Sequence, residues 1–349
     1  MNPSRASTSD TAMTFSNAES RRTRWGRRLR TVPAVIVGFA VATVLLPAVL
    51  AVAGIYDLVR AARHRGRFAA VRSAVFGWVY LVVEVAGLTC LLLFWIITGW
   101  GRRRRLLLRL TFVLQGWWGE ALLGTVRLLF GVRLEAEGHE ALNSGPFVLM
   151  VRHASLVDTL LPTVLVIRRH HICLRHVLKR ELLWDPALDV AGNTTPNYFV
   201  DRLRGAGEIE AVRALADGLG PRDGVAIWPE GTRFTPERQA RALAALGRQD
   251  PDLAALASGF RHVLPPRLGG PLALLDAGTD VVFCAHVGFD GLSHVKSILG
   301  GGIVGTTVKV AFWRIAAADI PSDYQGRVRW LFDQWRAVDE WVGAHLQAA

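Results

Sequence analysis

Cysteine is scarce in this sequence. Three cysteines occur in 349 residues, an odd number, and Cys90 lies within a long apolar run. A disulfide framework needs paired cysteines, so none is indicated. His170, His171 and His176 are present, but no acidic or cysteine partners stand beside them at the spacing of a metal site. We therefore expect neither disulfides nor a metal, and no bound cofactor.

Two further signals are missing. No Gly-x-Ser-x-Gly elbow occurs, which argues against a serine hydrolase. No nucleic-acid-binding motif occurs either, although the net charge is +12. The positive charge is carried almost entirely by arginine, in a chain whose residues are 51% hydrophobic. This combination predicts a lipid bilayer with anionic headgroups as the partner, and no nucleic acid.

Two long stretches have little or no charge. Residues 32–56 contain no charged residue, and residues 75–100 contain only Glu84. Each stretch is long enough to cross a bilayer as a helix. Arginine clusters flank the pair, which predicts a membrane hairpin with both ends in the cytoplasm. We favour a paired Glu84 in the hairpin interface over a functional one.

The loop between the two stretches is basic as well, which leaves two other arrangements open. The hairpin could lie in the cytoplasmic leaflet without crossing it. Alternatively, the first stretch could be a signal peptide that is cleaved near residues 51–53. In all three arrangements the chain after Arg105 lies on the cytoplasmic side of the cell membrane.

From residue 132 onward, short apolar runs alternate with stretches of helical periodicity. This predicts an α/β fold in which a mixed sheet is flanked by helices. Strands are expected over residues 132–137, 147–151, 171–178, 198–200, 225–227, 281–287 and 307–313. Helices are expected over residues 158–168, 182–192, 208–218, 236–246, 251–257, 272–277 and 322–346. In the last helix, apolar residues from Val328 to Val342 recur at helical spacing, which predicts a packing face.

The chain therefore divides into five parts. We expect a disordered basic tail at 1–30, a membrane-anchoring hairpin at 31–105 and an interfacial linker helix at 106–131. The α/β domain covers 132–320, and a C-terminal amphipathic helix covers 321–349. The oligomeric state is left open.

A histidine and an aspartate follow the predicted strand at 147–151. His153 comes directly after this apolar run, and Asp158 follows five residues later. Histidine can take and return a proton near neutral pH. A carboxylate about one helical turn away can fix the imidazole tautomer and stabilise the imidazolium. The pair predicts a general base for a substrate that brings its own hydroxyl.

A second motif, Gly-Val-Ala-Ile-Trp-Pro-Glu-Gly-Thr-Arg, begins at Gly224. Its apolar start predicts a buried strand, and Pro229 to Thr232 predict a sharp turn. Gly231 allows close approach of a ligand to the backbone, and Arg233 offers a planar set of donors for an anionic group.

Taken together, these motifs resemble the signature blocks of the glycerolipid acyltransferases, the lysophosphatidic acid acyltransferase-like enzymes. The matching blocks are His153 with Asp158, Lys179-Arg180-Glu181-Leu182, Phe199-Val200-Asp201-Arg202 and Pro229-Glu230-Gly231-Thr232-Arg233. The resemblance covers residues 134–317. Two positions depart from the family pattern. Trp228 stands where the family usually has phenylalanine, and Asn197-Tyr198 replace the glycine-containing segment that usually precedes the Asp-Arg block.

The resemblance implies transfer of a fatty acyl group from an acyl thioester, acyl-CoA or acyl carrier protein, to the free hydroxyl of a lysophospholipid. With 1-acylglycerol-3-phosphate as the acceptor, the product is phosphatidic acid. It implies His153 and Asp158 as the catalytic residues. The implied substrate-binding residues are Lys179, Arg202, Glu230, Gly231, Thr232 and Arg233.

Several roles stay open at this point. Glu230 could orient Arg233 or contact the hydroxyls of the acceptor, and structural roles for Glu230 and Arg202 are nearly as plausible. Arg267 either helps to bind a substrate or lies in a solvated turn. The acceptor could also be another lysophospholipid or a glycolipid. A non-enzymatic alternative is an inactive membrane scaffold that retains the fold.

Overall fold

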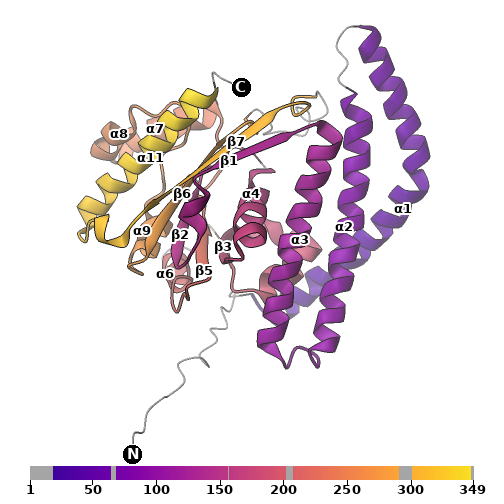
Figure 1. The fold of residues 1–349 in the computed structure, drawn as a ribbon, viewed down its shortest axis with the longest axis horizontal. Helices are drawn as coiled ribbons and strands as arrows, with labels where there is room; N and C mark the ends of the chain where they lie inside the picture. The colour runs from indigo at the N-terminus through magenta and orange to yellow at the C-terminus, as the bar shows by residue number, and fades with distance from the viewer. Residues whose placement is uncertain (1–18, 64–67, 156, 202–206, 291–300, 347–349) are drawn as a thin grey trace, which may run out of the picture.

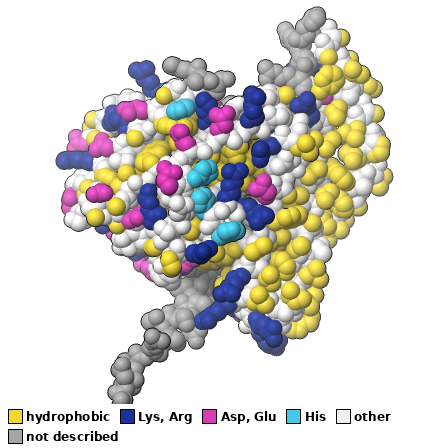
Figure 2. Space-filling model, viewed as in Figure 1, with side chains coloured by type: hydrophobic (Ala, Val, Ile, Leu, Met, Phe, Trp, Pro, Cys, Tyr) yellow, Lys and Arg dark blue, Asp and Glu magenta, His cyan; other side chains and the backbone are white. Residues whose placement is uncertain are grey.

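The computed structural model describes residues 19–63, 68–155, 157–201, 207–290 and 301–346. Three long helices come first: α1 (Arg21–Ala62), α2 (Ala69–Ile97) and α3 (Arg104–Phe130). They stand side by side along one flank of an α/β domain (Figure 1). Many apolar side chains of α1 are exposed, and Figure 2 shows a broad hydrophobic surface on this flank. By length and composition, α1 and α2 could each cross a membrane.

The first helix begins earlier than the sequence suggests. Ser20 caps α1, since its side chain accepts a hydrogen bond from the backbone nitrogen of Thr23 at 3.1 Å. The prediction of disorder is therefore wrong for residues 21–30, which are helical. The tail before Glu19 lies outside the described residues. The start of α1 is ordered because it contacts the α/β domain. Arg27 and Arg28 donate to the carboxylate of Asp189, which is fully buried in that domain.

The sheet has seven strands and is mixed, as predicted. Its order is β1-β7-β6-β2-β5-β3-β4, and only the β6–β7 pair is antiparallel within the described residues. The strands are β1 (Arg133–Glu137), β2 (Phe147–Val151), β3 (Cys173–Lys179), β4 (Tyr198–Val200), β5 (Asp223–Ile227), β6 (Asp280–Val287) and β7 (Thr307–Ile315). Because β2, β5, β3 and β4 run parallel, their carboxyl ends meet at one edge.

Helices cover both faces of this sheet. They are η1 (His139–Leu142), η2 (Val157–Thr159), α4 (Leu160–Pro162), η3 (Thr163–Arg168), η4 (Arg180–Trp184), α5 (Pro186–Thr194), α6 (Gly207–Ala214), α7 (Pro236–Gln249), α8 (Pro251–Ala257), α9 (Gly269–Leu275), η5 (Ala317–Asp319) and α11 (Tyr324–Leu346). Two predicted helices differ in form. Residues 158–168 pass through 3-10, α and π geometry, and residues 182–192 divide at Asp185, which caps α5.

Helix ends were predicted less well. The helix expected at 208–218 ends at Ala214, and the helix expected at 236–246 continues to Gln249. A single glycine, Gly247, weakens a helix by only about 1 kcal/mol, so it does not stop α7. Helix α7 ends before Asp250. The side chain of Asp250 caps the next helix, α8, by accepting a hydrogen bond from the backbone nitrogen of Leu253.

Alternation along β2 divides the core into two layers. Phe147, Leu149 and Val151 pack toward α3 and η3, whereas Val148 and Met150 pack toward α6, α9 and α11. The predicted packing face of α11, from Val328 to Val342, is buried in the second layer. Glu84 is paired, as expected, but its partners lie in α3 and α5 and not in the interface between α1 and α2. Its carboxylate is buried and accepts from the indole nitrogen of Trp118 at 3.2 Å and from the backbone nitrogen of Ala187 at 3.3 Å.

Candidate active site

His153 lies at the carboxyl end of β2, on the loop that leaves the strand. Its side chain is 10% exposed, and Nδ1 lies 3.2 Å from Oδ1 of Asp158, which is fully buried. A carboxylate can only accept, so Nδ1 carries the hydrogen and the lone pair is on Nε2. This leaves Nε2 as the basic nitrogen of the pair.

Backbone groups hold the Asp158 carboxylate in place. Oδ2 accepts from the backbone nitrogens of Ala154 at 2.7 Å and Ser155 at 2.8 Å. The Ser155 hydroxyl in turn accepts from Val157 and Asp158, which closes the turn. The five-residue spacing of His153 and Asp158 thus forms a compact loop in which the carboxylate faces the imidazole.

Glu230 joins the second motif to His153. One carboxylate oxygen accepts from the backbone nitrogen of His153 at 2.8 Å, and the other accepts from the backbone nitrogen of Leu264 at 3.0 Å. The backbone nitrogen of Phe234 donates to the carbonyl of His153 at 2.7 Å. Hydrogen bonds from both ends of the turn therefore fix it against the loop that carries the imidazole.

The Glu230 side chain is 2% exposed, and burial raises its pKa to about 8. The charge of Arg152 and the two backbone donors oppose this shift but do not cancel it. Both carboxylate oxygens bond to backbone nitrogens, so this geometry supports a structural role for Glu230. It aligns two segments of the site.

Gly231 permits the turn. Its φ angle is +65°, and a Cβ atom built there would lie 2.7 Å from Nε of Arg267. The backbone nitrogen of Arg267 also donates to the carbonyl of Pro229 at 2.9 Å. Thr232 and Arg233 follow and are partly exposed. The turn thus places Arg233 one residue from the Phe234 hydrogen bond to His153.

Two predicted substrate-binding residues remain: Lys179, which the structure describes, and Arg202, which it does not. Lys179 is the last residue of β3, next to the end of β5. Side chains alternate along a strand, so Lys179 leaves the sheet on the face of Val177, opposite to that of His176. Arg202 lies outside the described residues.

With this geometry established, the chain can be compared with known proteins. Residues 133–274 match the acyltransferase family. Among solved structures, it is similar to PlsC from Thermotoga maritima, a 1-acyl-sn-glycerophosphate (LPA) acyltransferase. The sequences are 17% identical, the match covers 74% of this chain and 97% of that chain, and the TM-score is 0.46. No curated protein is significantly similar in sequence.

The acyltransferase domain also contains a buried arginine whose role the sequence does not reveal. Arg152 is fully buried and donates to the carbonyl of His286 at 2.6 Å, to the carbonyl of His262 at 3.0 Å and to the Asp290 carboxylate at 2.6 Å. His286 lies 3.7 Å from Asp158, and burial lowers the pKa of this imidazole. The position of Arg152 beside His153 is visible in the sequence, but its three distant partners are not.

Aromatic packing supports the other side of His153. The ring centroids of Trp228 and His153 are 6.3 Å apart, and Trp228 stacks on His176 at 6.4 Å. Burial lowers the pKa of His176 to about 4, so that imidazole is neutral at physiological pH. His176 therefore acts as a packing partner in the acyltransferase domain.

Among the described residues, no group of three or more His, Cys, Asp or Glu side chains is placed to hold a metal ion. Cys90, Cys173 and Cys284 are free.

Proposed function

We propose that this acyltransferase transfers a fatty acyl group from an acyl thioester to the free hydroxyl of a lysophospholipid. The acceptor in this proposal is 1-acylglycerol-3-phosphate, and the product is phosphatidic acid. One observation carries the proposal: a histidine whose Nδ1 is held by a buried aspartate stands beside a turn with a partly exposed arginine, in an acyltransferase domain. The resemblance of the motifs to glycerolipid acyltransferases supports the choice of acceptor.

The chemistry requires one proton transfer in each direction. Nε2 of His153 takes the proton of the acceptor hydroxyl while the oxygen attacks the thioester carbonyl carbon. The C–S bond then breaks, and the imidazolium returns the proton to the thiolate sulfur, so the products are an ester and a free thiol. Asp158 stabilises the imidazolium between these two steps. A base of this kind contributes about 10²–10⁴-fold in rate.

Arg233 is the proposed partner of the acceptor phosphate. A guanidinium presents several donors in a plane that suits a phosphate, and Gly231 lets the ligand approach the turn closely. The hydrogen bonds between this turn and His153 keep the two groups in fixed relation. A phosphate only a few bonds from its hydroxyl could then contact Arg233 while the hydroxyl contacts Nε2.

The membrane has a place in this function because the acceptor is a lipid. The apolar surface of α1 and α2 supports attachment to a bilayer. We propose that the acyltransferase domain lies on the cytoplasmic side of the cell membrane, where arginine-rich segments flank the apolar ones.

An acyl-transfer assay on the purified full-length protein tests the proposal. Acyl-CoA and acyl carrier protein donors are offered with lysophosphatidate, with a lysophospholipid of larger headgroup and with uncharged monoacylglycerol. We expect phosphatidic acid from lysophosphatidate and almost none from the His153→Ala protein. His171→Ala is the matched control, because His171 is exposed and precedes β3, at the opposite edge of the sheet.

Arg233→Ala separates acceptor recognition from chemistry. Loss of a hydrogen bond to a charged group costs about 1.5–3 kcal/mol, so we expect KM for lysophosphatidate to rise by about tenfold or more. The KM for monoacylglycerol should hardly change. Transfer that survives His153→Ala would refute the assigned base. Transfer to uncharged acceptors alone would refute the role of Arg233.

A further inference from the structure

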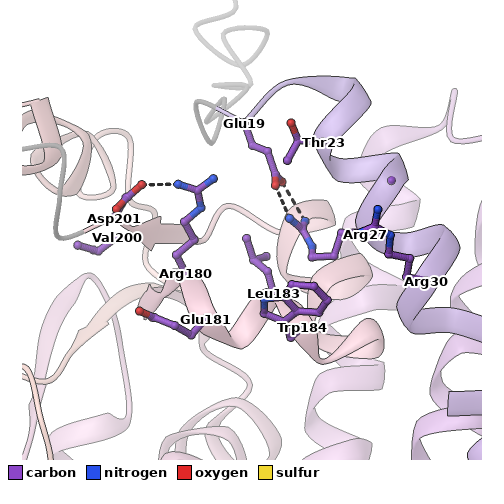
Figure 3. A pocket seen from close by; sticks show the side chains of 11 residues that line it. Glu19, Thr23, Arg27, Arg30, Arg180, Glu181, Leu183, Trp184, Val200 and Asp201 are labelled. Atoms are coloured by element: carbon purple, nitrogen blue, oxygen red, sulfur yellow. Dashed lines mark hydrogen bonds and ion pairs between the residues drawn. The ribbon is translucent and has the colours of Figure 1, made fainter. Parts of the chain in front are cut away.

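A cavity lies between the first turns of α1 and the α/β domain, and His153 is not among the residues that line it. Its volume is about 470 Å³, within the usual range for small-molecule sites. Its walls include Glu19, Arg27, Arg30, Arg180, Trp184 and Asp201. Figure 3 shows Arg180 paired with Asp201 on one side and Arg27 paired with Glu19 on the other.

The cavity belongs to the same sheet edge as the candidate active site. Arg180 follows the last residue of β3, and Asp201 follows the last residue of β4. From β2, which carries His153, the sheet order leads through β5 and β3 to β4. Adjacent strands are about 4.8 Å apart, so β4 lies roughly 14 Å from β2. An acceptor whose hydroxyl is at His153 cannot place its own phosphate that far away, but a donor with a long arm can reach both sites.

The chemistry of the walls fits a nucleotide. Arg30 is exposed, and Arg180 is 39% exposed and still has donors beyond those that one carboxylate can accept. Trp184 is 62% exposed and lines the cavity, so its ring is accessible to a ligand. An exposed aromatic ring is a platform on which a nucleobase can stack, and arginine is the preferred partner of phosphate groups.

The acidic groups in the wall strengthen this assignment. A bare phosphate brings no donor for the acceptor oxygens of Glu19, Glu181 and Asp201. A nucleotide, in contrast, brings an amino group and ribose hydroxyls that donate to carboxylates. A lining with both signs of charge and one aromatic face therefore suits a nucleotide better than it suits a lipid headgroup.

We propose that this cavity binds the nucleotide part of coenzyme A, so that acyl-CoA is a donor for this enzyme. Adenine stacks on Trp184, and the phosphates contact Arg30 and Arg180. The acyl-pantetheine arm then follows the sheet edge from β4 to the thioester position beside His153. The role of the cavity as a donor site rests on the proposed acyl transfer. Nucleotide binding itself can be measured without any acyl transfer.

The test is a calorimetric titration in which adenosine 3′,5′-bisphosphate is added to the full-length protein in zwitterionic micelles. Loss of one stacked base costs about 1–3 kcal/mol, so Trp184→Ala should weaken binding by about tenfold. Arg30→Ala should also weaken it. The matched controls are Trp25→Ala and Arg22→Ala, two exposed positions of α1 outside the cavity wall, which should bind as the wild type does.

A kinetic comparison completes the test. In Trp184→Ala and Arg30→Ala, KM for acyl-CoA should rise by about tenfold, while the kinetics with acyl-pantetheine should stay unchanged. Wild-type binding by both variants would overturn the assignment. So would equal defects with both donors, or saturable binding of anionic-lipid vesicles at Trp184 in place of the nucleotide. Nucleotide binding without acyl transfer from any donor would instead refute the proposed function and support the cavity.

Discussion

The two polar sites on the sheet edge hold their carboxylates in different ways. At His153, the carboxylates of Asp158 and Glu230 accept mainly from backbone nitrogens, and both are nearly or fully buried. At the cavity, Glu19 and Asp201 accept from arginine side chains, and the side chains of the Arg180–Asp201 pair are 39% and 19% exposed. The first arrangement fixes atoms that must not move, whereas the second can exchange partners.

This difference suits two functions, proton transfer at His153 and ligand binding at the cavity. Proton transfer needs a donor and an acceptor that are held within about 0.5 Å of their productive positions, and backbone hydrogen bonds can hold them so. Binding of a soluble donor needs side chains that can leave one anion for another. The comparison predicts that substitutions near His153 change rate and stability, whereas substitutions around the cavity change affinity.

Asp158→Asn should have the largest effect. An asparagine can present its amide group to Nδ1 and favour the wrong imidazole tautomer. We expect kcat to fall by about 10²–10⁴-fold, while circular dichroism shows an unchanged fold. A variant with kcat within threefold of the wild type would contradict the role of the buried carboxylate.

Glu230→Ala should affect stability as well as rate. It leaves two buried backbone nitrogens without acceptors, at about 1–3 kcal/mol each, so the free energy of unfolding should fall by about 2–6 kcal/mol. Urea unfolding followed by tryptophan fluorescence measures this change. A loss of activity with no change in stability would show that Glu230 contacts substrate instead.

Asp189→Asn tests the attachment of α1. The fully buried Asp189 carboxylate accepts from Arg27 and Arg28, and removal of one partner of a buried ion pair costs about 3 kcal/mol. We expect faster amide hydrogen exchange in the first turns of α1. Glu210→Gln is the control, because Glu210 and Arg213 form an exposed pair worth less than about 1 kcal/mol. Equal exchange in both variants would refute the docking role.

The raised pKa of Glu230 gives a pH dependence with a defined sign. In the unfolded chain this carboxyl ionises near its usual pKa of about 4.3, whereas the folded protein keeps the proton until about pH 8. The stability of the wild type relative to Glu230→Gln should therefore fall as the pH rises through this window. Thermal unfolding of both proteins at a series of pH values measures the difference. A difference that grows with pH would mean that the carboxylate is stabilised in the folded state.

Two glycines with the same backbone conformation give the smallest but sharpest contrast. Gly231 and Gly278 have φ angles of +65° and +61°, but only Gly231 has another residue, Arg267, within contact distance of an added Cβ. Replacement of either by alanine should cost about 1–2 kcal/mol of stability. Only Gly231→Ala should reduce acyl transfer, by about tenfold, because Arg267 and the turn must shift. Equal activity of the two variants would remove Gly231 from the site.

Strands and motifs were predictable because their signals are local. The apolar runs at residues 147–151 and 198–200 became β2 and β4 with the same bounds. The His153 and Asp158 pair was predictable for the same reason, since five residues close the loop that joins them. Helix ends were less predictable, because Ala214 and Gln249 end their helices through contacts and caps that periodicity does not encode.

The sequence by itself determined the apolar helices, the strands and the identity of the chemical groups, since each depends on residue type and on spacing within one segment. Tertiary structure decided which of these groups meet. It placed Glu230 on the backbone of His153, which is 77 residues away, and it packed the basic start of α1 against Asp189, more than 160 residues away. Such contacts depend on sheet order and on burial, and neither can be read from one segment of the chain.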